Sequence, residues 1–169
     1  FGTTKNLQKQ FGDHRVFDIP TSENAMTGIA IGCAINRCPV VMTHQRLDFS
    51  LLAFDQIINN AAKIFYMFNG QFTVPITLRL IVGKGWGQGP THAQSLQSLF
   101  AHIPGLKVVM PSNPNNAKKL LIQSIEDPNP VIFIEHRWLH DQKGHVEKDF
   151  NSKKIGKANL LMKGNDITI

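Results

Sequence analysis

Two kinds of apolar pattern alternate along this chain. Short apolar runs rich in β-branched residues are typical of buried strands, whereas apolar residues that recur every three or four positions are typical of helices. The runs that predict strands are Val16–Ile19, Pro39–Thr43, Val74–Val82, Leu106–Met110 and Val131–Glu135. Helical spacing predicts helices that start near Ser22, span Ser50–Phe68, start at His92 and span Asn113–Glu126. This alternation predicts an α/β fold with three layers, α/β/α, around a mainly parallel sheet.

The joint between the first predicted strand and helix carries an acid, Glu23. Pro20 closes the strand, and Thr21 and Ser22 are residues that favour a helix N-cap. Parallel α/β sheets bind ligands at the carboxyl ends of their strands, so we expect Glu23 to face a crevice. The alternative is that Glu23 is an ordinary first-turn acid, stabilised by the helix dipole.

The composition predicts one soluble domain. The chain has 169 residues, of which 42% are hydrophobic, and this is enough to bury a core. No apolar run approaches the roughly 18 residues of a membrane helix. The net charge of +6 is scattered and forms no basic stripe, so neither nucleic acid nor a membrane is an expected partner. Cys33 and Cys38 are expected to be reduced thiols, which suits a compartment such as the cytoplasm.

A glycine-rich segment, GKGWGQGPTHAQS, follows the third predicted strand. It is not a dinucleotide fingerprint, because the third required glycine falls on Gln88 or Pro90, and no Gly-Lys-Ser/Thr ends it as in a phosphate-binding loop. Alternating glycines restrict the backbone little, so we expect a mobile loop that delivers Trp86 and His92 to the crevice. The alternative is that His92 is a surface residue or a helix cap.

The segment VFDIPTSENAMTGIAIG around Glu23 resembles the beta chains of thiamine-diphosphate-dependent 2-oxo acid dehydrogenases, the pyruvate and branched-chain enzymes. The segments FSLLAFDQIINNAAKIFYMF and LFAHIPGLKVVMPSNPNNAKKLL extend the resemblance over residues 2 to about 140. It implies the pyrimidine-binding fold of thiamine enzymes. It also implies that residues 1–140 form this transketolase-like domain without its N-terminal strand and helix, and that residues 141–169 are a linker and the start of a C-terminal transketolase-like domain.

The resemblance assigns roles to four residues. Glu23 would bind a ring nitrogen of the cofactor's aminopyrimidine, and a carboxyl group that shares this proton favours the imino tautomer needed for activation. Phe49 would stack on the aminopyrimidine, and Met42 would lie at the end of the preceding strand. His92 would face the substrate and its lipoyl acceptor, although Ala93 replaces the serine that usually follows.

The sequence departs from the family between Met42 and Phe49, where it is about three residues longer and contains His44, Arg46 and Asp48. Polar residues in a loop are commonly just solvated. The alternative is that they reshape the substrate end of the pocket, which leaves the identity of the 2-oxo acid open.

Two further segments raise the question of a metal. The resemblance implies a structural monovalent cation, such as potassium, at Ser124, Asp127 and Asn129, although turn chemistry alone explains these residue types. The histidines of the polar tail are irregularly spaced, so we expect a linker there and not a metal site. They are His136, His140 and His145.

The resemblance implies oxidative decarboxylation of a 2-oxo acid and acyl transfer to the disulfide of a lipoyl group. The implied cofactor is thiamine diphosphate, with its diphosphate and magnesium held mainly by an alpha subunit, without which this chain is inactive. The other implied partners are a second beta subunit, which completes a heterotetramer, and a lipoyl-bearing acyltransferase. The compartment would be the cytoplasm, or the mitochondrial matrix in a eukaryote. The alternatives are another transketolase-like enzyme that transfers ketols, and a non-catalytic assembly module of the same fold.

Overall fold

A computed structural model describes residues 2–148, 154–158, 160 and 162–168. Four parallel strands form its sheet in the order β1-β2-β4-β3. Their bounds are β1 Val40–His44, β2 Ile76–Val82, β3 Lys107–Val109 and β4 Val131–His136. The central strand β2 is buried at all seven positions, which is typical of a parallel sheet covered on both faces. The predicted α/β class and four of the five predicted strands are confirmed.

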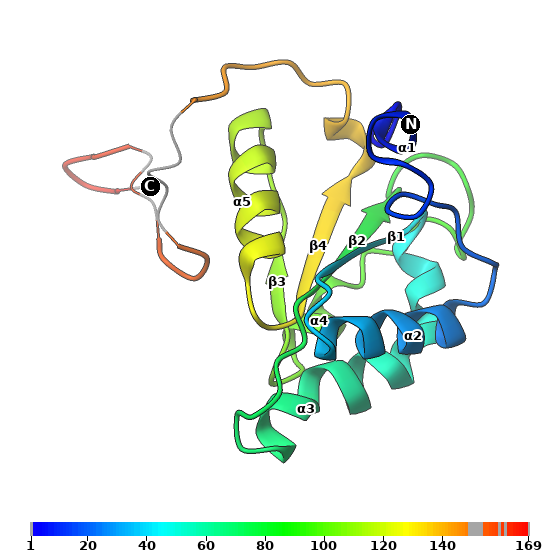
Figure 1. Cartoon of the computed structure of the whole chain (residues 1–169). Helices are drawn as coiled ribbons and strands as arrows, with labels where there is room; N and C mark the ends of the chain where they lie inside the picture. The colour runs from blue at the N-terminus through cyan, green and yellow to red at the C-terminus, as the bar shows by residue number, and fades with distance from the viewer. Residues whose placement is uncertain (1, 149–153, 159, 161, 169) are drawn as a thin grey trace.

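Helices cover both faces of this sheet (Figure 1). One face carries α2 (Glu23–Ile35), a long helical stretch and the short α4 (Gln97–Ala101). The other carries α5 (Pro114–Glu126), where Leu120 and Leu121 pack against β3 and β4. The outlying elements are a short helix α1, Leu7–Phe11, before the fold and a 3₁₀ turn η3, Arg137–Leu139, after β4. The predicted three layers are therefore present.

The long helical stretch changes geometry twice along its length. It runs from a 3₁₀ segment η1 (Leu47–Ala53) through a π segment η2 (Gln56–Ala61) to α3 (Ala62–Met67). Asn69 and Gly70 end it with φ values of 51° and 75°, as their order in the sequence predicts. The buried side includes Ala53, Ile57 and Ala61, whereas the outer side exposes apolar residues. These are Leu52, Phe65, Tyr66 and Met67.

The start of α5 follows its sequence signals. The Asn113 side chain accepts a hydrogen bond from the Asn116 backbone N–H, and Pro114 occupies the first turn, where no N–H is needed. Ile125, a third apolar residue of this helix beside Leu120 and Leu121, is exposed. It lies in the last turn of α5, whereas the contacts with the sheet come from the middle turns.

Two predicted elements are wrong. Val16–Ile19 is not a strand, and Phe17 is 60% exposed, because no segment in the described chain pairs with it and a strand needs a hydrogen-bonded neighbour. His92 does not open a helix, because α4 begins at Gln97. The backbone N–H of Gln94 is instead bound to the side chain of Asp48.

Cys33 and Cys38 are exposed free thiols, as predicted. None of the helices in the described part of the chain combines the length and the apolar character that crossing a bilayer requires.

Gly105 is a sensitive point of this fold. It has φ +101°, and a Cβ there would lie 2.0 Å from the Ala62 carbonyl oxygen. We expect Gly105→Ala to lower the free energy of unfolding by about 2–5 kcal/mol, measured by urea denaturation. The control is Gly87→Ala, where φ is +72° and nothing lies within 4 Å. It should cost only the backbone strain, about 1–2 kcal/mol, and equal losses would show that the contact with Ala62 is unimportant.

Candidate functional site

The candidate site lies at the carboxyl ends of β1 and β2. Glu23 is the first residue of α2, His44 is the last residue of β1, and the glycine-rich loop follows β2. Phe49 lies in η1, which begins just after β1. The topology therefore brings Glu23, Met42, Phe49 and His92 to one side of one sheet edge.

Met42 lies beneath α2. It is 6% exposed, and its sulfur is 3.7 Å from the hydroxyl of Thr27, one turn after Glu23. Strand β1 continues two residues beyond Met42, to His44. The two alternating residues on the buried face of β1 are Met42 and His44, which places the imidazole nearer the sheet edge.

His44 is a buried imidazole close to the carboxylate of Glu23. Within the described chain its Nε2 makes no hydrogen bond. Burial lowers the pKa of His44, and the negative charge of Glu23 opposes this shift only in part. The imidazole is therefore neutral at pH 7.

Arg46 and Asp48 are buried, and both form hydrogen bonds with the glycine-rich loop. One interpretation of the sequence was that these residues are solvated. Arg46 donates from Nε and Nη2 to the side-chain oxygen of Gln88, at 2.9 and 2.5 Å. The Oδ1 of Asp48 accepts from the backbone N–H of Gln94 at 3.2 Å and from its side-chain amide at 2.8 Å. The interpretation of this segment as a solvated loop is wrong.

His92 contacts Phe49 directly. The two ring centroids are 5.4 Å apart with an interplanar angle of 85°, an edge-to-face arrangement. The Nδ1 of His92 is 3.0 Å from the hydroxyl of Thr91. Both rings are partly exposed, so a ligand can reach them.

The other side of the glycine-rich loop is held by η3. The guanidinium of Arg137 lies 3.0 Å from the centre of the Trp86 ring, a cation–π contact. Trp86 also packs on Trp138, with centroids 5.9 Å apart, and Trp138 Nε1 donates to the Lys84 carbonyl at 3.2 Å. The loop predicted to move is thus fastened on both sides. Sequence patterns did not reveal Gln88, Gln94, Arg137 or Trp138, because their partners lie tens of residues away.

The residues predicted to hold a monovalent cation lie at the opposite, amino-terminal end of the strands. The hydroxyl of Ser124 donates to the Leu120 carbonyl. The carboxylate of Asp127 accepts from the Asn129 N–H at 2.9 Å and pairs with Lys107 at 2.5 Å. The side chains of Ser124 and Asp127 are therefore occupied by turn and ion-pair contacts, and a cation here would depend mainly on backbone carbonyls. No group of three or more His, Cys, Asp or Glu in the described chain could hold a metal.

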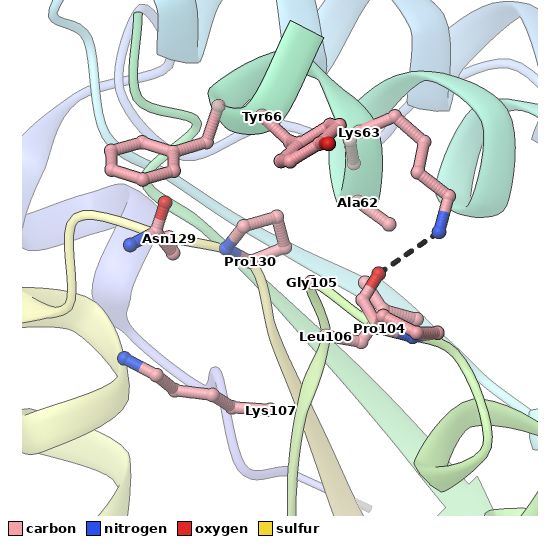
Figure 2. Close-up of a pocket in the computed structure, with 11 residues that line it drawn as sticks. Ala62, Lys63, Tyr66, Pro104, Gly105, Leu106, Lys107, Asn129 and Pro130 are labelled. Carbon is pink, nitrogen blue, oxygen red and sulfur yellow. Dashed lines mark hydrogen bonds between the residues drawn. The ribbon is translucent and has the colours of Figure 1, made fainter. Parts of the chain in front are cut away.

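A cavity of about 620 Å³ opens beside this turn (Figure 2). It lies between α3 and the starts of β3 and β4, and Lys63 crosses its rim to bind the Pro104 carbonyl at 3.0 Å. Its lining is mainly apolar and includes Phe65, Tyr66 and Asn129. It is remote from Glu23, so it is not part of the candidate site.

Comparisons with known proteins agree with this geometry. The family model described as transketolase, pyrimidine binding domain, matches residues 1–142. Acetoin:2,6-dichlorophenolindophenol oxidoreductase subunit beta of Bacillus subtilis is 44% identical over 99% of the chain and 49% of that protein. Pyruvate dehydrogenase E1 component subunit beta of Porphyra purpurea is 43% identical over the whole chain and 51% of that protein. The 2-oxoisovalerate dehydrogenase subunit beta of B. subtilis is 41% identical over the whole chain and 52% of that protein.

The chain thus spans about half the length of these curated relatives. A solved structure, a split gene transketolase described as an inactive beta4 tetramer, matches with a TM-score of 0.64 at 17% identity. The match covers 80% of this chain and 42% of that one, and at this identity it shows the fold alone.

The buried His44 predicts a pH dependence of stability. Because its pKa is lowered in the folded state, the unfolded chain takes up a proton below about pH 6.5 that the folded chain resists. Stability is therefore lost as the pH falls from 7 to 5. We expect His44→Gln to reduce this loss of stability. The reduction is at most about 1.4 kcal/mol for each unit by which folding lowers the pKa of His44, measured by urea denaturation at each pH. His102→Gln, at an exposed histidine, is the control, and an equal effect of both variants would refute the argument.

Proposed function

The chain belongs to the family of transketolase pyrimidine-binding domains, and on this basis we propose that it is the beta-chain part of a thiamine-diphosphate-dependent 2-oxo acid dehydrogenase. The observation that carries the proposal is the position of Glu23. Its carboxylate lies at the start of α2, beside the carboxyl end of β1, where ligands of parallel α/β sheets bind. Relatives named for pyruvate and 2-oxoisovalerate support the 2-oxo acid class. The relative named for acetoin, which is a hydroxy ketone and not an acid, supports the role of a beta subunit in an oxidoreductase.

The residues present fit an aminopyrimidine. The ring needs a hydrogen-bonding acid for its nitrogen and an apolar surface for its face. Glu23 is half-buried, and its carboxylate makes no hydrogen bond within the described chain, so this group is available to a ligand. Phe49 offers an aromatic ring to the face of the aminopyrimidine, and the buried Met42 adds apolar surface to the base of the candidate site.

The residues of this chain would bind and orient the reacting groups. Thiamine diphosphate, when bound, supplies the electron sink for decarboxylation. Glu23 would share a proton between its carboxylate and the ring nitrogen, a transfer that an amide could not perform. His92, fixed against Phe49, would face the substrate and its lipoyl acceptor.

In this proposal, the chain supplies half of an active site, and an alpha subunit supplies the other half. Neither the glycine-rich loop nor another segment carries a phosphate-binding motif. An alpha subunit would therefore hold the diphosphate and the magnesium ion, and this chain alone would be inactive. A structural potassium ion, if bound, would use backbone carbonyls near Ser124, Asp127 and Asn129. Residues 1–140 would form the pyrimidine-binding domain, and residues 141–169 the linker to a second transketolase-like domain.

The outer side of the long helical stretch supports an oligomer. Leu52 and Met67 are 64% and 59% exposed, and exposed apolar patches of this kind are typical of subunit interfaces. A second beta subunit would cover this side, and the lipoyl-bearing acyltransferase would approach the substrate end. The cytoplasm, or the mitochondrial matrix in a eukaryote, is the proposed compartment.

The relatives indicate three candidate substrates. Identities of 44%, 43% and 41% to relatives named for acetoin, pyruvate and 2-oxoisovalerate are too similar to choose between them. The full-length beta subunit, reconstituted with its alpha partner, should therefore be screened against all three compounds with dichlorophenolindophenol as acceptor.

On the best substrate, Glu23→Gln should abolish turnover and leave the circular dichroism spectrum unchanged, because the side chain keeps its size but can no longer relay a proton. Glu126→Gln, at an exposed acid at the end of α5, is the matched control and should retain full activity. Turnover by Glu23→Gln within about tenfold of the unmutated protein, equivalent to about 1.4 kcal/mol of barrier, would contradict the assignment.

A further inference from the structure

Two buried charged side chains form hydrogen bonds with the glycine-rich loop, one before His92 and one after it. Arg46 holds Gln88, four residues before the histidine, and Asp48 holds Gln94, two residues after it. Arg46 and Asp48 are only 8% and 7% exposed. Burying a charge is costly unless its hydrogen bonds are made, so each side chain is committed to its partner in the loop.

The two ends of the glycine-rich loop also lie close together, because the backbone of Gly83 approaches that of His92. A Cβ at Gly83 would lie 3.2 Å from the His92 carbonyl oxygen, so only a glycine lets the backbone approach this closely without adjustment. The ring of His92 meets Phe49, which is the residue directly after Asp48. His92 is therefore restrained through its carbonyl, through its ring and through the backbone that follows it.

We propose that Asp48 is a positioning residue for His92, with Arg46 as a second anchor of the same loop. Its carboxylate fixes the backbone at Gln94, and this sets where the His92 ring lies against Phe49. The histidine is thus in place before a ligand binds, and loop closure is not required to deliver it. The part played by His92 in catalysis rests on the proposed function, whereas the anchoring of the loop does not.

The two oxygens of Asp48 differ, and this provides a conservative variant. Oδ1 accepts both bonds from Gln94, whereas Oδ2 is buried and makes no hydrogen bond within the described chain. Asparagine keeps an acceptor oxygen in the place of Oδ1, so Asp48→Asn should preserve the anchor. Asp48→Leu keeps the branched shape, with a larger volume, but removes the acceptor.

The anchor can be tested without any activity, by hydrogen–deuterium exchange at the Gln94 amide in the full-length beta subunit bound to its alpha partner. Asp48→Leu should speed exchange at least about tenfold, because the amide loses its acceptor. Asp48→Asn should stay within about threefold of the unmutated protein. Asp55→Leu is the control and should leave the exchange of the Gln94 amide unchanged, because Asp55 is an exposed acid whose carboxylate, among the described residues, binds Gln56 and Asn59 alone. Unchanged exchange in Asp48→Leu would overturn the proposal.

The positioning role is tested by separating two half-reactions. Asp48→Leu should slow acyl transfer to lipoyl groups about 100-fold, the size expected from a small misplacement of a reacting group. It should slow turnover with an artificial acceptor less than tenfold. Asp48→Asn should transfer acyl groups to lipoyl groups at nearly the unmutated rate. The double variant, His92→Ala with Asp48→Leu, should transfer them no more slowly than His92→Ala alone.

Two results would overturn the positioning role. One is a double variant whose acyl-transfer rate falls by the product of the two single losses. The other is Asp48→Leu with faster exchange at the Gln94 amide but a normal rate of acyl transfer to lipoyl groups. If Asp48→Leu does not fold, Gln94→Leu removes the side-chain bond while leaving Asp48 in place, and it should slow the lipoyl step in the same direction. An unmutated protein that is inactive on every substrate would refute the proposed function but leave the exchange result as a test of the anchor.

Discussion

Parallel pairing of β1 with β2 positions every group in the candidate site. The register sets Val40 opposite Ile76 and His44 opposite Leu80, so both strands point the same way and end at the same edge. Because β2 also pairs with β4 in parallel, the segment η3 after β4 arrives at this edge too. The buried polar segment, the glycine-rich loop and η3 can therefore contact one another, although they are far apart in the sequence.

The cost of this arrangement is a set of buried polar groups. Arg46 and the Oδ1 of Asp48 are satisfied by amide groups of the glycine-rich loop, so the loop and the segment after β1 each need the other. His44 ends β1, lies within reach of the charge of Glu23, and keeps its Nε2 without a hydrogen bond in the described chain. Unsatisfied buried groups are destabilising and tend to occur where function requires them. Their position beside Glu23 agrees with the proposed role of this sheet edge.

The sequence predicted the parts of the fold that depend on local patterns. Continuous apolar runs revealed the four strands, and Asn113 with Pro114 marked the start of α5 correctly. Val16–Ile19 has a similar apolar character but forms no strand, because pairing depends on a neighbour and not on the segment itself. The anchors of the loop could not be predicted, since Asp48 and Gln94 meet only after the sheet has formed. The same holds for Trp86 and Arg137, because their contact joins two segments that are far apart in the sequence.

The central claim is that this chain supplies the aminopyrimidine half of a shared thiamine site. Isothermal titration of thiamine diphosphate and magnesium into the full-length beta subunit, the alpha subunit and their mixture tests it most directly. The account predicts micromolar or tighter binding to the mixture only, weakened by Glu23→Ala, with much weaker binding to the beta subunit alone. Micromolar binding to the isolated beta subunit, or binding to the mixture that does not depend on Glu23, would contradict it.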